Sequence, residues 1–190
     1  MVKRAFISVF DKTGIAEFAA RLAQYGFEIV STGGTYKELC EKGIEAIEIS
    51  EITGFTELLG GKVKSLHPAI HAGILAYRDK EKDMKSLQDN RITPIDVVVC
   101  NLYPFEQAVK KNAELPELIE NIDIGGVTLL RSAGKNFASV TCVFDPSDYD
   151  TVLEQLATGQ TTYELRKKLA IKSFEYVAEY DALIARTLKG

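Results

Sequence analysis

Cysteine is scarce in this sequence, and the few cysteines present are far apart. The 190 residues include only Cys40, Cys100 and Cys142, and no Cys-x-x-Cys pair occurs. A disulfide framework or a zinc ribbon needs paired or regularly spaced cysteines, so we expect neither. Reduced, scattered thiols are typical of a cytoplasmic protein, and we expect this location.

Histidine is scarcer still, because the sequence contains only His67 and His71. They are four residues apart and would share one face of a helix. Zinc needs a third protein ligand, and no Glu or Cys follows at a suitable spacing. We therefore expect no metal site, and we expect His67 to have a structural or substrate-facing role.

Long apolar runs and an excess of positive charge are also missing. No apolar run approaches the roughly 18 residues of a membrane-spanning helix, and the first residues show no signal-peptide cleavage pattern. The 23 Lys and Arg residues are outnumbered by 27 Asp and Glu residues, which gives a net charge of −4. We expect no membrane association and no nucleic-acid partner, since general nucleic-acid binders are usually basic. An anionic small ligand stays possible, because a few local cations decide its binding.

What the sequence does contain is an ordinary apolar fraction of 46% arranged as alternating strand and helix patterns. No internal repeat or Pro/Ser-rich linker divides residues 1–190, so we expect a single domain. Strand patterns lie at residues 5–9, 27–30, 46–49, 96–100 and 139–144, and helix patterns lie at 15–23, 35–41, 80–91, 125–133, 146–158 and 165–178. Between residues 51 and 74, glycines and a proline indicate loops and short helical pieces. The alternation predicts an α/β fold with a mainly parallel sheet flanked by helices.

Hydroxyl-rich loops follow the first two predicted strands, where parallel sheets usually bind ligands. Residues 8–14 read SVFDKTG and residues 31–35 read STGGT. Each loop precedes a helix N-terminus, which favours an anion, and Lys12 adds a positive charge. The same residues are also common in helix caps and tight turns. Together the two loops indicate a phosphate site, although neither matches a Walker A or GxGxxG motif.

A basic segment, Gly60-Gly61-Lys62-Val63-Lys64-Ser65, comes next. In an extended chain, Lys62 and Lys64 would point to the same side. Two like charges on one side favour an anion between them. The alternative is a solvated basic loop.

Further candidates follow the later strands. Asn101 follows the strongest strand pattern, and its amide is suited to reading the edge of a base. Tyr103 could donate a proton or only pack. Asp123 could act chemically or cap the helix that follows it, and Lys135 could act chemically or complement the end of that helix.

Eight short segments together identify a resemblance. They are residues 8–14 (SVFDKTG), 31–35 (STGGT), 52–55 (ITGF), 63–68 (VKSLHP), 71–75 (HAGIL), 101–105 (NLYPF), 122–126 (IDIGG) and 131–136 (RSAGKN). In this order they resemble the IMP cyclohydrolase domain of the bifunctional purine-biosynthesis family, AICAR transformylase/IMP cyclohydrolase. The resemblance covers nearly the whole chain but not the family's transformylase domain.

The resemblance implies a methylglyoxal-synthase-like fold and a reaction that needs no cofactor. That reaction is the dehydrative closure of 5-formamidoimidazole-4-carboxamide ribonucleotide to IMP. Substrate-binding roles are implied for Ser8, Phe10, Asp11, Lys12, Thr32, Gly33, Gly34, Thr35, Lys62, Val63, Lys64, Ser65, Cys100, Asn101, Asp123 and Ile124, and catalytic roles for Lys64, Tyr103, Asp123 and Lys135. We expect a homodimer, because this is the commonest assembly of such enzymes.

Two positions depart from the family pattern, and one of the implied catalytic residues raises a geometric difficulty. Lys62 and Ser65 stand where the family usually has Arg and Thr, which keeps a cation and a hydroxyl but loses the arginine fork. A straight helix from Asp123 to Lys135 would place its ends about 18 Å apart, too far to reach one base. Two rival functions share the fold: a methylglyoxal-synthase-type lyase, and a nucleotide-binding module without catalysis.

Overall fold

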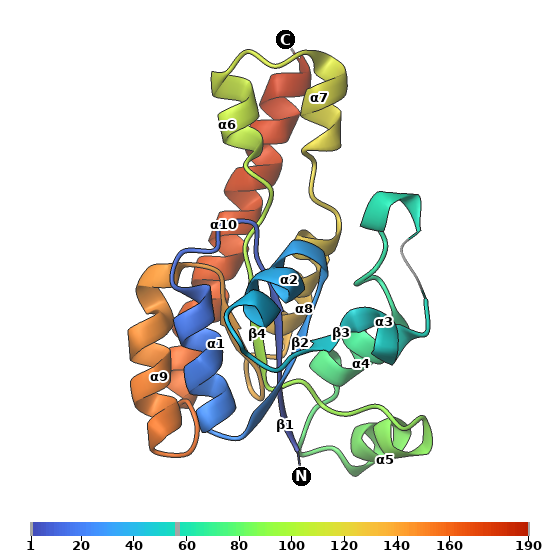
Figure 1. Ribbon diagram of the computed structural model, residues 1–190, viewed down its shortest axis with the longest axis vertical. Helices are drawn as coiled ribbons and strands as arrows, with labels where there is room; N and C mark the ends of the chain where they lie inside the picture. Colours follow the sequence, from blue (N-terminus) through green and yellow to red (C-terminus); the bar gives the residue numbers. More distant parts are fainter. Residues whose placement is uncertain (1, 56–57, 190) are drawn as a thin grey trace.

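The computed structural model describes residues 2–55 and 58–189 and has a five-stranded parallel sheet at its centre (Figure 1). The strands are β1 (Lys3–Ser8), β2 (Phe27–Ser31), β3 (Ile47–Glu48), β4 (Val97–Cys100) and β5 (Thr141–Val143). Their order across the sheet is β3-β2-β1-β4-β5, and every neighbouring pair is parallel. The predicted α/β class with a mainly parallel sheet is confirmed.

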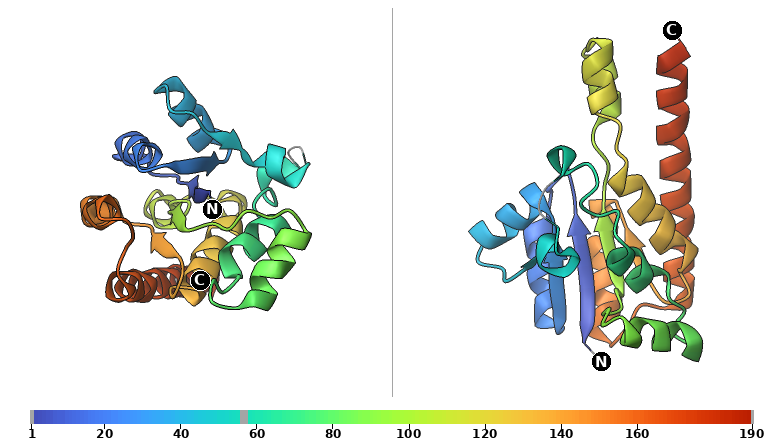
Figure 2. Two further views of the ribbon diagram at one scale, coloured as in Figure 1. Left: turned by 90° about the horizontal axis from the view of Figure 1, so that it is seen from below. Right: turned by 90° about the vertical axis from the view of Figure 1, so that its right-hand side faces the viewer.

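Helices flank the sheet on both faces. They are α1 (Ile15–Gln24), α2 (Gly33–Glu41), α3 (Ile49–Thr53), α4 (Pro68–Leu75), α5 (Glu81–Asp89), α6 (Phe105–Lys110), α7 (Leu115–Glu120), α8 (Gly125–Lys135), α9 (Tyr149–Ala157) and α10 (Tyr163–Lys189), with short 3₁₀ helices at Leu59–Gly61 and Pro146–Asp148. The long α10 packs along α8 and continues beyond the sheet, where it contacts α6, and α6 in turn contacts α7 (Figures 1 and 2).

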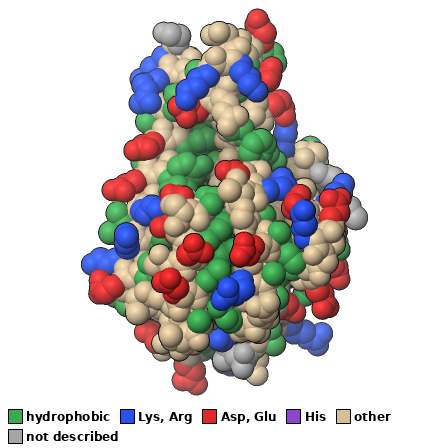
Figure 3. All heavy atoms as spheres, turned by 60° about the vertical axis from the view of Figure 1, so that its left-hand side comes forward, with side chains coloured by type: hydrophobic (Ala, Val, Ile, Leu, Met, Phe, Trp, Pro, Cys, Tyr) green, Lys and Arg blue, Asp and Glu red, His purple; other side chains and the backbone are tan. Residues whose placement is uncertain are grey.

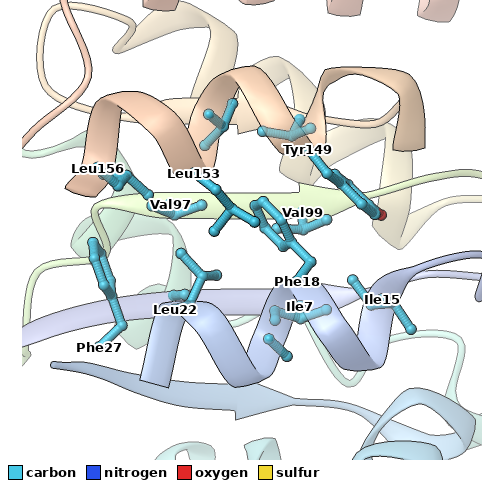
Figure 4. Packing of buried hydrophobic residues seen from close by; sticks show 14 of the residues in the cluster. Ile7, Ile15, Phe18, Leu22, Phe27, Val97, Val99, Tyr149, Leu153 and Leu156 are labelled. Carbon is cyan, nitrogen blue, oxygen red and sulfur yellow. The ribbon is translucent and has the colours of Figure 1, made fainter. Parts of the chain in front are cut away.

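Side-chain alternation in the strands creates a core on each face of the sheet. Ile7 of β1 faces a core that includes Phe18 of α1 and Tyr149 of α9, whose rings stack at 4.3 Å (Figure 4). Phe6, its neighbour in β1, faces the opposite core, which includes Leu129 of α8. The parallel register pairs Ile7 with Ser31 and Ser8 with Cys100, so the carboxyl ends of β1, β2 and β4 meet at one edge.

The predicted elements are confirmed, with several shifted boundaries. The third strand shortens to two residues because α3 begins at Ile49, and α10 extends well beyond residue 178. Short helices occupy part of the predicted irregular stretch 51–74, of which residues 56 and 57 lie outside the described residues. The sequence interpretation missed α6 and α7, because six residues are too few to display a helical period.

The surface matches the mixed composition. On the face shown in Figure 3, acidic and basic side chains are interspersed with apolar ones. Within residues 2–55 and 58–189, no helix has the length and apolar character required to cross a membrane.

Candidate functional site

A cavity of about 580 Å³ opens at the carboxyl edge of the sheet. Five segments line it: the loop after β1, the start of α2, residues 60–65, the loop after β4, and residues 119–126 leading into α8. Most of the predicted site residues line this cavity, namely Ser8, Phe10, Lys12, Thr32, Gly34, Thr35, Lys62, Lys64, Ser65, Cys100, Asn101, Tyr103, Asp123 and Ile124. The fold therefore brings together segments that are more than 100 residues apart in the sequence.

A second hollow of about 910 Å³ adjoins the first and shares Phe10, Lys12, Asn101 and Tyr103 with it. Its walls are largely aromatic and acidic, with contributions from α6 and α10. The first cavity combines two helix N-termini, several hydroxyls and three lysines, so it suits a phosphorylated ligand better.

Hydroxyl groups tie the two phosphate-loop candidates together. Ser8 Oγ and Thr32 Oγ1 are hydrogen-bonded at 2.8 Å. Thr35 Oγ1 accepts a hydrogen bond from Val9 N at 3.0 Å and donates one to Val9 O at 2.9 Å. Thr32 precedes α2 but makes no side-chain capping hydrogen bond. The hydroxyls thus join the loops to each other instead of capping the helix. Thr35 contributes to this link by its two hydrogen bonds to the backbone of Val9.

Two lysine ammonium groups converge on the first turn of α2. A Cβ atom added to Gly33 would lie 2.6 Å from Nζ of Lys64, and one added to Gly34 would lie 3.9 Å from Nζ of Lys12. Gly33 has φ +46°, a left-handed conformation that favours glycine. Positive charge from both lysines therefore adds to the positive end of the helix dipole, which is the electrostatic pattern of an anion site.

Asn101 holds the backbone of the loop after β1. Its Oδ1 accepts hydrogen bonds from Phe10 N at 2.7 Å and Asp11 N at 3.0 Å, and its Nδ2 donates to Asp11 O at 3.0 Å. These three bonds fix the loop after β1. Asn101 also lines the cavity, and its role in reading a base edge stays a prediction, because these bonds use only one of the two Nδ2 hydrogens.

Asp123 places a carboxylate between two loops of the cavity. Its Oδ1 accepts a hydrogen bond from Gly126 N at 2.7 Å, and its Oδ2 accepts one from Tyr103 N at 3.3 Å. Burial raises the pKa of Asp123 above its ordinary value, while these hydrogen bonds and the charge of Lys64 act in the opposite direction. The residue therefore bonds to the first turn of α8, as the capping alternative required, and also lines the cavity.

An extended segment would have placed Lys62 and Lys64 side by side, but in the structure they are not. Residues 59–61 form a 3₁₀ turn, and Lys62 Nζ turns outward to Glu120, at 2.8 Å from Oε2 and 3.0 Å from Oε1. Lys64 instead lies over Gly33. The condition of an extended chain is therefore not met, and the two lysines line different parts of the cavity.

Four predicted site residues do not line the cavity. Gly33 lies behind Lys64, Val63 is part of a turn, and Asp11 accepts hydrogen bonds from its own loop neighbour Thr13. Lys135 is exposed at the far end of α8, and this eleven-residue helix places it about 15 Å from the cavity end. A role for Lys135 in the cavity of its own chain is therefore not supported by its placement.

The sequence interpretation missed the wall formed by Ile119, Glu120 and Ile122. This wall belongs to α7 and the turn after it. Pro116 in the first turn of α7 is a helix-start signal that could have located this helix.

Both histidines form hydrogen bonds within the fold. His67 Nδ1 accepts a hydrogen bond from Ala69 N at 3.1 Å and thereby caps α4. His71 Nδ1 is 3.0 Å from Ser132 Oγ of α8, and burial lowers its pKa. In the described part of the chain, His, Cys, Asp and Glu side chains form no group of three that could hold a metal ion.

Comparisons with known proteins agree with this geometry. Residues 14–128 match the family described as MGS-like domain, and residues 133–190 match the family described as AICARFT/IMPCHase bienzyme. The bifunctional purine biosynthesis protein PurH of Persephonella marina is 51% identical over 189 residues, and that of Streptococcus mutans is 54% identical over 187 residues. These alignments cover 99% and 97% of this chain but only 37% and 36% of the relatives, so the chain spans little more than a third of their length.

A solved structure matches over its whole length. The crystal structure of ForH superposes with a TM-score of 0.86 at 36% sequence identity, and the match covers 100% of both chains. The fold of this chain is thus also found in a solved structure that it matches from end to end.

Proposed function

The chain belongs to the family of MGS-like domains, and we propose that it is an IMP cyclohydrolase. In this proposal residues 1–190 form one catalytic domain acting on 5-formamidoimidazole-4-carboxamide ribonucleotide. The observation that carries the proposal is the cavity lined by both Lys64 and Asp123, in which Lys64 lies over the start of α2. The 51–54% identity to PurH proteins supports it.

The cavity suits a purine nucleotide precursor in size and polarity. About 580 Å³ lies within the usual range of roughly 300–1,000 Å³ for small-molecule sites. The 5′-phosphate would lie at the start of α2, near Lys12 and the hydroxyls of Ser8 and Thr32. The base would then reach toward Lys64, Tyr103 and Asp123.

The proposed chemistry is an intramolecular addition followed by loss of water. The carboxamide nitrogen attacks the formyl carbon, a carbon–nitrogen bond forms, and the carbonyl electron pair moves onto the formyl oxygen. Asp123 accepts the proton lost by that nitrogen, and Lys64 stabilises the oxygen as it becomes negative.

Loss of water completes the ring. The proton held by Asp123 passes to the oxyanion and gives a hydroxyl. Tyr103 then donates a proton to this hydroxyl as the carbon–oxygen bond breaks, and the second ring nitrogen returns a proton to the Tyr103 phenolate as the carbon–nitrogen double bond forms. The atoms of substrate equal those of IMP plus water, and no electrons are transferred. The reaction therefore needs no redox cofactor.

The direct test is an ultraviolet assay of the purified chain with the formamido ribonucleotide, without added metal, cofactor or formyl donor. We expect formation of IMP. Binding of IMP by the folded chain without turnover would instead identify a nucleotide-binding module, and conversion of a triose phosphate would identify a lyase.

Substitution of Gly33 tests the phosphate end of the site. We expect Gly33→Ala to raise KM about 10-fold, equal to about 1.4 kcal/mol of binding. Its Cβ would lie 2.6 Å from Lys64 Nζ, on a backbone with φ +46° that disfavours alanine. Gly34→Ala is the matched comparison, because its Cβ would meet Lys12 Nζ at an ordinary 3.9 Å. A larger rise of KM in Gly34→Ala than in Gly33→Ala would contradict this view of the site.

We also propose a cytoplasmic homodimer. The three free cysteines support the location, because disulfides are typical of oxidising compartments. Exposed apolar side chains, including Leu115 and Ile119 of α7, support association of two chains. Sedimentation analysis over a range of concentrations tests the assembly, and a strictly monomeric chain would contradict it.

A further inference from the structure

Two tyrosines one turn apart on α10 reach the loops that carry Tyr103 and Asp123. We propose that Tyr176 and Tyr180 are positioning residues for the ring closure, and that their hydroxyls hold these two loops at the correct separation. The inference rests on the proposed function. It assigns an active-site role to α10, which contributes no residue to the wall of the first cavity.

Tyr180 fixes the segment that ends in Asp123. Its hydroxyl accepts a hydrogen bond from Asp123 N at 2.8 Å and donates one to Asn121 O at 3.0 Å. The side chain is buried, and its ring meets that of Phe105 edge-to-face at 6.2 Å. Burial raises the pKa of Tyr180 to about 12, so the hydroxyl keeps its proton and can use both bonds at neutral pH.

Tyr176 fixes the other loop in the same manner. Its hydroxyl accepts a hydrogen bond from Leu102 N at 3.3 Å, directly before Tyr103. Its ring stacks on Phe144 at 4.2 Å with an interplanar angle of 3°. This stacking holds the ring in one orientation, so the hydroxyl presents a fixed acceptor to the loop.

The two loops are also bonded to each other. Tyr103 N donates to Asp123 Oδ2 at 3.3 Å, which closes a three-sided arrangement of α10, the loop after β4 and the turn before α8. Of the hydrogen bonds that form these three sides, the one between the two loops depends on the Asp123 carboxylate, whereas the two tyrosine hydroxyls bond to backbone N–H groups. When Asp123 accepts a proton from the substrate, that bond weakens, and the two tyrosine bonds to backbone N–H groups keep both loops in place.

The division of the chain between the two family matches fits this assignment. Residues 102–103 and 121–123 lie in the segment that matches the MGS-like domain, whereas Tyr176 and Tyr180 lie in the segment that matches the AICARFT/IMPCHase bienzyme. In this assignment a helix from the second matched segment positions loops of the first.

Tyr180→Phe and Tyr176→Phe test the inference, because each removes one hydroxyl and keeps the ring. We expect each to lower kcat about 10–100-fold with little change in KM, since a misplacement of about 1 Å can cost 10²-fold in rate. Tyr149→Phe is the matched control. Tyr149 is also buried, but its hydroxyl has no hydrogen-bond partner among the described residues, and its ring packs in the opposite core. We expect kcat of Tyr149→Phe within about twofold of the wild type.

Two further measurements separate positioning from general stability. Hydrogen–deuterium exchange of the Asp123 amide is expected to become faster in Tyr180→Phe and to stay unchanged in Tyr149→Phe. The acid limb of the pH profile of kcat is expected to move to lower pH in Tyr180→Phe, because a loosened loop admits water to Asp123 and removes part of the burial that raises its pKa. Ionisable groups that interact electrostatically with Asp123 include Lys64, Cys100, Tyr176 and Tyr180, and Tyr103 lines the same cavity. Both variants leave Lys64, Cys100 and Tyr103 in place.

The outcomes are distinguishable. Turnover by the wild type together with unchanged kcat, pH profile and exchange in both tyrosine variants would overturn the inference and leave the proposed function intact. Absence of turnover by the folded wild type would overturn the proposed function and, with it, the assignment of the tyrosines to ring closure. If Tyr180→Phe fails to fold, Tyr176→Phe decides by kcat, by the pH profile and by exchange of the Leu102 amide, which donates to the Tyr176 hydroxyl.

Discussion

Replacement of Lys64 by alanine is expected to lower kcat for IMP formation by about 10²–10³-fold, the usual cost of removing one oxyanion-stabilising donor. The ammonium of Lys64 lies over Gly33 at the start of α2 and acts electrostatically on Asp123 across the cavity. The positive charge of Lys64 therefore acts both at the start of α2, where the phosphate would bind, and on the carboxylate of Asp123. Steady-state kinetics of the variant measure the effect.

The comparison of kcat with KM separates two roles for Lys64. A loss confined to kcat indicates stabilisation formed in the transition state, whereas a rise of KM alone would show that Lys64 only binds the ground-state substrate and would contradict its catalytic assignment. Lys168→Ala is the control, since Lys168 is exposed on α10 and lines neither of the two cavities. We expect its kinetics to match the wild type.

Asp123→Asn is expected to lower kcat by about 10²–10⁴-fold, because the amide cannot accept the proton of the attacking nitrogen. The substitution keeps nearly the same shape, and its carbonyl oxygen can still accept the hydrogen bond from Gly126 N. We therefore expect a large loss of kcat with little change in the thermal unfolding temperature. Asp89→Asn is the control, because Asp89 is exposed on α5 and pairs with Lys85.

The pH dependence gives an independent test of Asp123. The proposed base is the ionised form, and burial raises its pKa above the ordinary value of 3.8. Activity is therefore expected to fall as the pH falls through this raised pKa, so the acid limb begins at a higher pH than an exposed aspartate would give. An acid limb that persists unchanged in the residual activity of Asp123→Asn would show that another group causes it.

Most of the fold could be predicted because its strands and longer helices have strong periodic patterns. The continuous apolar run at residues 97–100 and the spaced apolar residues of α1 both gave elements of the correct type. The short helices α6 and α7 could not be recognised in the same way. The first of them packs against α10, which begins more than 50 residues later in the chain, and α7 packs against α6.

The candidate site was less predictable than the fold, because the residue types alone do not fix their partners. Asn101 has the donor and acceptor groups of a base reader, and its sequence position gave no sign that three hydrogen bonds would also join it to the loop after β1. Lys62 has the charge of a phosphate ligand, but it pairs with Glu120. In both cases a residue distant in the sequence determines what the side chain contacts.

The α/β class, the parallel sheet and the set of polar loops at its carboxyl edge could be predicted, because they depend on local periodicity and on residue types at strand ends. Which side chains share the cavity could not be predicted in this way, because it depends on how distant segments pack. The tertiary structure brought Lys64 over Gly33, placed Lys135 at the remote end of α8, and connected Tyr176 and Tyr180 to the loops of Tyr103 and Asp123. These relations depend on long-range packing and on hydrogen bonds between distant segments, which no local pattern specifies.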